Sequence, residues 1–171
     1  MSRSIAAAAP SAQYKSPFAV VNDFLGEAPV DLEGMARALG LEVHMDADLP
    51  DDVSGRIKRL RGMRGDRFVI EVNGAHPSRR RRFTLAHEIA HYLLHQDLFG
   101  DSLEDSEMYR SGLPEPVEYE ANRYAADLLM PANLVRTLFR AGVKSLNHLS
   151  DAFDVSEGAL RIRLKQLRLD A

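Results

Sequence analysis

The sequence contains no cysteine and no long run of apolar residues. Without cysteine the chain forms no disulfide bond and offers no thiolate, so any metal must be held by histidine and carboxylate side chains. No stretch approaches the roughly 18 consecutive apolar residues that a membrane-spanning helix needs. We therefore expect a protein that does not cross a membrane, in a setting compatible with the reducing cytoplasm.

The composition is that of a folded protein, with 171 residues of which 45% are hydrophobic and 27% are charged. This length allows one ordinary domain with a small appendage. Residues 1–17 are predicted to be a flexible leader, because their apolar stretch is too short for a signal peptide. We expect the main domain over residues 18–140, and a helical appendage packed on it over residues 141–171.

Three segments have the alternating or β-branched pattern of strands, namely residues 41–45, 53–60 and 67–72. Short turns join them, so the sequence predicts a small, mostly antiparallel three-stranded sheet. An amphipathic helix with Asp31 as its N-cap is expected just before them, over residues 30–39.

Helical patterns dominate the rest of the chain. The apolar stripe of residues 78–95 is broad enough for a deeply buried helix, and residues 117–129 have a second helical pattern that Pro131 closes. Beyond residue 141, two short helical patterns flank a turn at residues 154–156, as in a helix-turn-helix. The predicted fold class is therefore α+β.

The clearest chemical motif is His87-Glu88-x-x-His91, which lies inside the first of these two helices. Residues four apart project from the same face of a helix, so both imidazoles can bind one metal ion. Glu88 lies beside the first histidine, where it can act as general base toward a water molecule. This is the arrangement of a zinc-dependent peptide hydrolase.

A catalytic zinc ion usually takes three protein ligands, so a third one is needed. His95 lies one further turn along the same helix, roughly 6 Å beyond His91 along the axis, which argues against it. We interpret it as a helix-end residue favoured by the macrodipole. The longer motif with glycine and a third histidine also fails, because Leu94 and Asp97 occupy those positions.

Carboxylates of the second helix are the remaining candidates, and these are Glu118, Glu120 and Asp127. Glu118 lies one turn from Asn122, whose amide can orient a ligand through a hydrogen bond. Glu120 projects roughly 200° away from Glu118, which favours a solvated surface position.

Two runs carry a family resemblance: RFTLAHEIAHYLLH from residue 82 and EYEANRYAADLLMP from residue 118. Together they resemble the ImmA/IrrE family of zinc-dependent metallopeptidases. This chain departs from the family's second motif only at Tyr124, where the family usually has phenylalanine. The resemblance extends over about residues 30–169. It implies a zincin-type helical core beside the sheet, Zn²⁺ bound by His87, His91 and Glu118, and Glu88 as catalytic base, with Asn122 in support.

The resemblance also implies a function: cytoplasmic cleavage of a specific protein partner, such as a helix-turn-helix repressor or an antitoxin, which derepresses stress-response or toxin-antitoxin genes. The alternative is a DNA- or protein-binding regulator with a non-catalytic zinc site. For an extended substrate, the sequence suggests strand addition along the edge of residues 68–72.

Charge is distributed unevenly along the chain. Residues 56–82 contain ten basic and two acidic residues, whereas residues 97–127 contain nine acidic and two basic ones. We favour neutralisation of these segments by each other and by solvent over a nucleic-acid surface. Direct DNA binding is not favoured for the C-terminal helices either, although Arg161, Arg163, Lys165 and Arg168 keep it open. For the run Arg79 to Arg82, two interpretations stand: binding of a partner or substrate, and solvation with one inward salt bridge.

Overall fold

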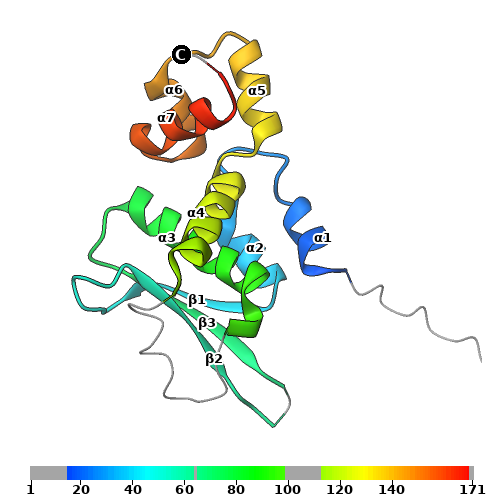
Figure 1. Cartoon of the computed structure of the whole chain (residues 1–171), viewed down its shortest axis with the longest axis vertical. Coiled ribbons are helices and arrows are strands. Elements are labelled where there is room, and N and C mark those ends of the chain that lie inside the picture. The colour runs from blue at the N-terminus through cyan, green and yellow to red at the C-terminus, as the bar shows by residue number, and fades with distance from the viewer. Residues whose placement is uncertain (1–14, 64, 99–112, 170–171) are drawn as a thin grey trace, which may run out of the picture.

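The computed structural model describes residues 15–63, 65–98 and 113–169, which form seven α-helices and three strands. Residues 1–14 of the predicted leader lie outside this range. A short helix that the sequence did not predict, α1 (Pro17–Asn22), starts at the end of the predicted leader, with Ser16 as its N-cap. The sheet lies at one end of the molecule and helices α5 to α7 at the other, with α3 and α4 between them (Figure 1).

The sheet consists of β1 (Leu41–Ala47), β2 (Gly55–Leu60) and β3 (Arg67–Asn73), in the order β1-β3-β2. β2 and β3 pair antiparallel, whereas β1 pairs with β3 in parallel. The sheet is therefore mixed, and the prediction of a mostly antiparallel sheet is wrong. The physical reason is that β3 carries the most β-branched segment and takes the central position, where it pairs along both edges.

Helices α2 (Leu32–Ala38) and α3 (Ser78–Leu94) lie against one face of this sheet (Figure 1). Asp31 caps α2 as predicted, accepting a hydrogen bond from the backbone N–H of Gly34. Gly40 follows with a positive φ of 79°, a conformation that suits glycine at a helix end. A 3-10 turn at Gln96–Leu98 follows α3.

Helix α4 (Glu115–Leu129) packs on α3 and leads into α5 (Ala132–Arg140). The predicted helix-turn-helix is present as α6 (Leu146–Phe153) and α7 (Glu157–Gln166). Ser156 caps α7, accepting from the N–H of Ala159. No helix in the described part of the chain is long and apolar enough to cross a membrane.

The basic segment is tied into the fold by ion pairs. Arg79 pairs with Asp151 and Asp154, and Arg81 pairs with Asp46. Other partners are Glu71 for Arg56 and Lys58, Asp66 for Arg59, Glu42 for Arg67, and Asp154 for Arg82. None of these acids belongs to residues 97–127, so mutual neutralisation of the two segments is wrong for these seven cations. The run Arg79 to Arg82 instead joins the start of α3 to the sheet and to the C-terminal helices.

Candidate metal centre

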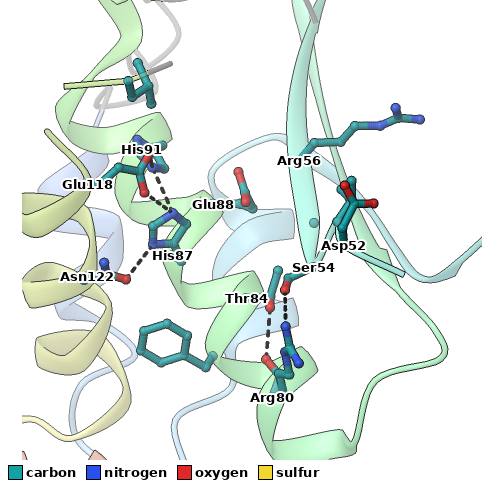
Figure 2. A pocket seen from close by; sticks show the side chains of 14 residues that line it. Asp52, Ser54, Arg56, Arg80, Thr84, His87, Glu88, His91, Glu118 and Asn122 are labelled. Carbon is teal, nitrogen blue, oxygen red and sulfur yellow. Dashed lines mark hydrogen bonds and ion pairs between the residues drawn. The ribbon is translucent and has the colours of Figure 1, made fainter. Parts of the chain in front are cut away.

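Helix α3 holds two histidine side chains at the floor of a cleft. Its apolar residues Leu85, Ala86, Ile89 and Ala90 are fully or almost fully buried, which fixes the rotation of the helix. His87 and His91 consequently project toward α4, while Glu88 projects toward β2 (Figure 2). His91 and Glu88 are buried, and His87 is partly open to the cleft.

Glu118 of α4 completes a cluster of three potential metal ligands. The Nε2 atoms of His87 and His91 lie 3.0 Å apart. The Glu118 carboxylate places Oε2 3.4 Å from His87 Nε2 and Oε1 3.6 Å from His91 Nε2. One donor atom from each residue lies within 4.8 Å of the others, which is the convergence that a single metal ion requires (Figure 2).

The outer nitrogen of each candidate ligand histidine has a hydrogen-bond partner. Asn122 Oδ1 lies 3.1 Å from His87 Nδ1, so the amide oxygen accepts from that ring (Figure 2). His91 Nδ1 lies 3.1 Å from His95 Nδ1, and His95 Nε2 lies 3.4 Å from Glu120 Oε2. These contacts hold the rings so that both Nε2 atoms face the Glu118 carboxylate.

Burial sets the protonation of the cluster in the absence of metal. Desolvation lowers the pKa of His87, and it lowers the pKa of His91 to about 3, with the neighbouring histidines adding to the effect on His91. Both rings are therefore neutral near pH 7 and able to bind a metal. Desolvation, and secondarily the charge of Glu118, raises the pKa of Glu88 to about 8. A divalent cation beside Glu88 would favour its carboxylate form.

The cluster opens into a cleft of about 550 Å³ between α3, α4 and the start of β2. Gly55, at the start of β2, brings the strand against α3 beside Glu88. A Cβ atom on Gly55 would lie 2.4 Å from Thr84 Cγ2 and 3.7 Å from Glu88 Oε1. Glycine at this position therefore allows the wall of the cleft to approach the face of α3 that carries Thr84 and Glu88.

A buried asparagine holds the loop that forms the same wall. Asn73 Nδ2 lies within hydrogen-bond distance of the carbonyl oxygens of Leu49, Pro50 and Val53, at 3.2, 3.1 and 2.9 Å. Its backbone N–H donates to Ser54 O. Asp52, Val53 and Ser54 line the cleft, so this one side chain shapes the wall opposite the histidines.

The structure brings together the sequence-predicted residues His87, Glu88, His91, Glu118 and Asn122. It does not bring Asp127 to the cluster, because that carboxylate pairs with Arg163 at 2.5 Å. Sequence reasoning missed the contacts of His95 and Glu120. The available signal was the four-residue spacing from His91 to His95, which repeats the spacing from His87 to His91.

The predicted substrate edge also needs correction. β3 is the central strand, so residues 68–72 have no free edge. β2 is the edge strand on the side of the cleft, and its first residues Gly55 and Arg56 line it (Figure 2).

Two histidines and a carboxylate on packed helices, with a buried glutamate at an open cleft, define a site of the metallopeptidase type. The chain belongs to the peptidase M78 family, described as the IrrE N-terminal-like domain, whose sequence pattern matches residues 38–165. This confirms the ImmA/IrrE resemblance.

A curated relative is the radiation response metalloprotease IrrE of Deinococcus deserti, which is 40% identical over 96 residues. The match covers 53% of this chain and 34% of the relative, so this chain matches only about a third of that protein's length. A solved structure of a Mycobacterium tuberculosis transcriptional regulator has a similar fold, with a TM-score of 0.53 and 20% identity. That likeness covers 86% of this chain and 46% of the regulator.

Proposed function

We propose that this protein is a zinc-dependent endopeptidase that hydrolyses a peptide bond in a specific protein partner. Its metal ligands are His87, His91 and Glu118, and its catalytic base is Glu88. The observation that carries the proposal is the convergence of three ligand atoms within 4.8 Å, with buried Glu88 on the same helix at the cleft.

The donor set fits zinc. Two neutral imidazoles and one carboxylate are the ligands of many catalytic zinc sites, which keep a further coordination position for the reaction. The bound ion supplies Lewis acidity and lowers the pKa of water toward neutrality.

The chain's own residues would move the proton. Glu88 accepts a proton from the attacking water and returns it to the leaving amine as the peptide bond breaks. Its burial excludes bulk water, so the proton stays at the site between the two steps. Asn122 keeps the His87 ring in position throughout.

The substrate is proposed to bind as an extended segment along β2. In the described part of the chain β2 is an edge strand at the cleft, and strand addition there would direct a peptide past Glu88. Members of a peptidase family act on proteins, and the relative IrrE is a radiation response metalloprotease. On this basis we propose a cytoplasmic reaction on a helix-turn-helix repressor or an antitoxin, whose cleavage derepresses stress-response or toxin-antitoxin genes.

A regulator that binds DNA or protein around a non-catalytic zinc is the second candidate, because α6 and α7 form a helix-turn-helix. Of the four basic residues on and just after α7, however, Arg163 is buried and pairs with Asp127, and Arg161 pairs with Glu157. A non-catalytic zinc also has no need for the buried carboxylate of Glu88. These observations favour the peptidase.

Co-expression with a helix-turn-helix regulator encoded beside this chain tests the proposal. We expect the zinc-loaded wild type to convert the regulator into two fragments, which mass spectrometry locates. Glu88→Gln should retain zinc and lose cleavage by at least about 100-fold, since general-base catalysis contributes roughly 10² to 10⁴. Full cleavage by a zinc-loaded Glu88→Gln protein would contradict the mechanism. An intact regulator, together with salt-sensitive binding of duplex DNA by this chain, would support the second candidate.

A further inference from the structure

Behind His91 lies a chain of hydrogen bonds that the catalytic mechanism above does not use. His91 Nδ1 contacts His95 Nδ1 at 3.1 Å, and His95 Nε2 contacts Glu120 Oε2 at 3.4 Å. His91 and His95 are buried, whereas Glu120, at the outer end of this series of hydrogen bonds, has a side chain that is 64% exposed. His95 is not part of the ligand cluster, because its contact is on the side of the His91 ring that faces away from that cluster.

We propose that His95 and Glu120 are positioning residues that set the tautomer and orientation of His91 for metal binding. The inference rests on the metal site of the proposed function. It adds two residues that support the site without binding the ion: His95 accepts a hydrogen bond from His91, and Glu120 accepts one from His95.

A histidine binds a metal ion through the lone pair of an unprotonated ring nitrogen. The Nε2 atom of His91 faces Glu118 and His87, so its lone pair must be free to bind the ion. The single ring proton of His91 must therefore be on Nδ1. That N–H then donates to His95 Nδ1, which must be the acceptor. A neutral His95 that accepts at Nδ1 carries its own proton on Nε2, and this N–H points at Glu120.

Glu120 gives this arrangement its direction. An ionised carboxylate only accepts hydrogen bonds, so it selects the His95 tautomer with the proton on Nε2. The opposite tautomer of His95 would donate from Nδ1 to His91 and place the His91 proton on Nε2. A proton there would block metal binding, so the Glu120 contact favours the binding-competent form.

Residues of helix α4 thus hold the two ligand histidines by different hydrogen bonds. Asn122 of α4 accepts directly from His87 Nδ1, whereas Glu120 of α4 acts on His91 through His95. Since Glu118 is also on α4, this helix provides a ligand and the final acceptor of both hydrogen-bond chains. Any shift of α4 against α3 would disturb all three contacts together.

Zinc affinity is the direct test, measured on the purified full chain by competition with a chromogenic chelator. We expect His95→Phe to weaken zinc binding about 10- to 100-fold, the usual effect of removing such a support. Glu120→Ala should weaken it less, by roughly 3- to 10-fold, because the carboxylate is exposed and acts through His95. The matched control is Glu115→Ala. Glu115 is an exposed glutamate of the same helix that takes no part in the hydrogen bonds from His91 to Glu120, so this variant should bind zinc like the wild type.

Two further variants separate positioning from folding. His95→Gln retains a side-chain oxygen that can accept from His91, so it should recover part of the affinity lost in His95→Phe. The double variant His95→Phe/Glu120→Ala should bind no more weakly than His95→Phe alone, since both act through one path. Nitrogen-15 spectra of the imidazoles in the zinc-loaded wild type should show protons on His91 Nδ1 and His95 Nε2.

The outcomes distinguish this inference from the function beneath it. Wild-type zinc affinity in a folded His95→Phe protein, or the opposite His95 tautomer in the spectra, would overturn the positioning role while leaving the metal site intact. If the wild type does not bind zinc, or if His87→Ala binds it equally well, the proposed function itself fails.

Discussion

At the scale of single residues, Glu88 illustrates the conflict between stability and catalysis. Glu88 is only 6% exposed, and its burial, together with the negative charge of Glu118, raises its pKa. A buried carboxylate without a cation is costly, so the folded metal-free protein favours the protonated form. The proposed catalytic base therefore lowers the stability of the fold that holds it.

The pH dependence of unfolding should reveal this cost. The pKa of Glu88 is raised to about 8 in the folded protein, against about 4.3 in the unfolded chain. Between these values the folded state binds more protons, so this group's contribution to stability falls as pH rises. We expect the metal-free wild type to lose about 2–4 kcal/mol relative to Glu88→Gln between pH 5 and pH 8.

Urea unfolding of both chelator-treated proteins across this range measures the difference. The exposed Glu33→Gln variant is the control, and its difference from the wild type should stay nearly constant. Parallel stability curves for wild type and Glu88→Gln would show that Glu88 ionises freely in the fold.

Gly55 is a second residue whose role is local. An added Cβ would meet Thr84 Cγ2 at 2.4 Å and Glu71 O at 3.0 Å, so Gly55→Ala should cost about 1–3 kcal/mol of unfolding free energy. Thr84→Ser removes the Cγ2 atom, so Gly55→Ala should cost less in the Thr84→Ser background. Thermal unfolding of the wild type, the two single variants and the double variant measures the coupling between the two positions. If their effects on the unfolding free energy simply add, the clash of the added Cβ is not with Thr84.

The ligand set shows how far residue spacing reaches. Helical periodicity places His87 with His91 on one face of α3, and Glu118 with Asn122 on one face of α4. The choice of Glu118 among the three carboxylates of α4 came from the family resemblance. The contact between His95 and Glu120 was not predictable, because it depends on how α3 and α4 cross. A helical projection correctly left Glu120 exposed, but it could not show that the long side chain reaches the neighbouring helix.

At the scale of elements, the three strands and most helices were predicted closely, whereas helix α1 and the strand order were not. Each strand was found from its own pattern, and the β2–β3 hairpin follows from proximity in sequence. The position of β1 is a long-range choice, because β1 pairs with β3, which is separated from it in the sequence by β2. Local turn chemistry contains no information about that choice.

The loop over residues 48–54 depends on one side chain for its shape. Asn73→Ala would leave the buried carbonyl groups of Leu49 and Val53 without their donor, at a cost of about 2–3 kcal/mol. Hydrogen exchange of residues 48–55 should accelerate more than that of α5. The exposed Asn147→Ala is the control, and unchanged exchange in Asn73→Ala would mean that the loop is held by other contacts.

At the scale of the whole molecule, a continuous buried core links the sheet to the C-terminal helices. Ile70, Ile89 and Leu128 belong to the same apolar cluster as Leu149, Phe153 and Leu160. Arg79 and Arg82 add ion pairs from α3 to Asp154. The boundary predicted at residues 140 and 141 remains a prediction, and these contacts indicate that the appendage stabilises the domain on which it packs.

Arg163 is the polar centre of that contact. It is 5% exposed, its Nε donates to Met130 O at 3.0 Å, and its guanidinium pairs with Asp127 at 2.5 Å. Met130 is the C-cap of the helix that carries Glu118, so α7 holds the far end of the helix that supplies the proposed third ligand. Since Asp127 is partly exposed, solvent screens part of the ion pair and limits its contribution.

Arg163→Ala should therefore lower the unfolding free energy by about 2–3 kcal/mol, mainly because the Met130 carbonyl loses its buried partner. Arg161→Ala, on the exposed side of the same helix, should change it by less than about 0.5 kcal/mol. Denaturant unfolding monitored by circular dichroism measures both. A packing role for Arg163 predicts that Arg163→Ala loses stability with no change in affinity for DNA. If α7 were only a DNA-reading helix, Arg163→Ala would instead leave stability unchanged and weaken the binding of duplex DNA.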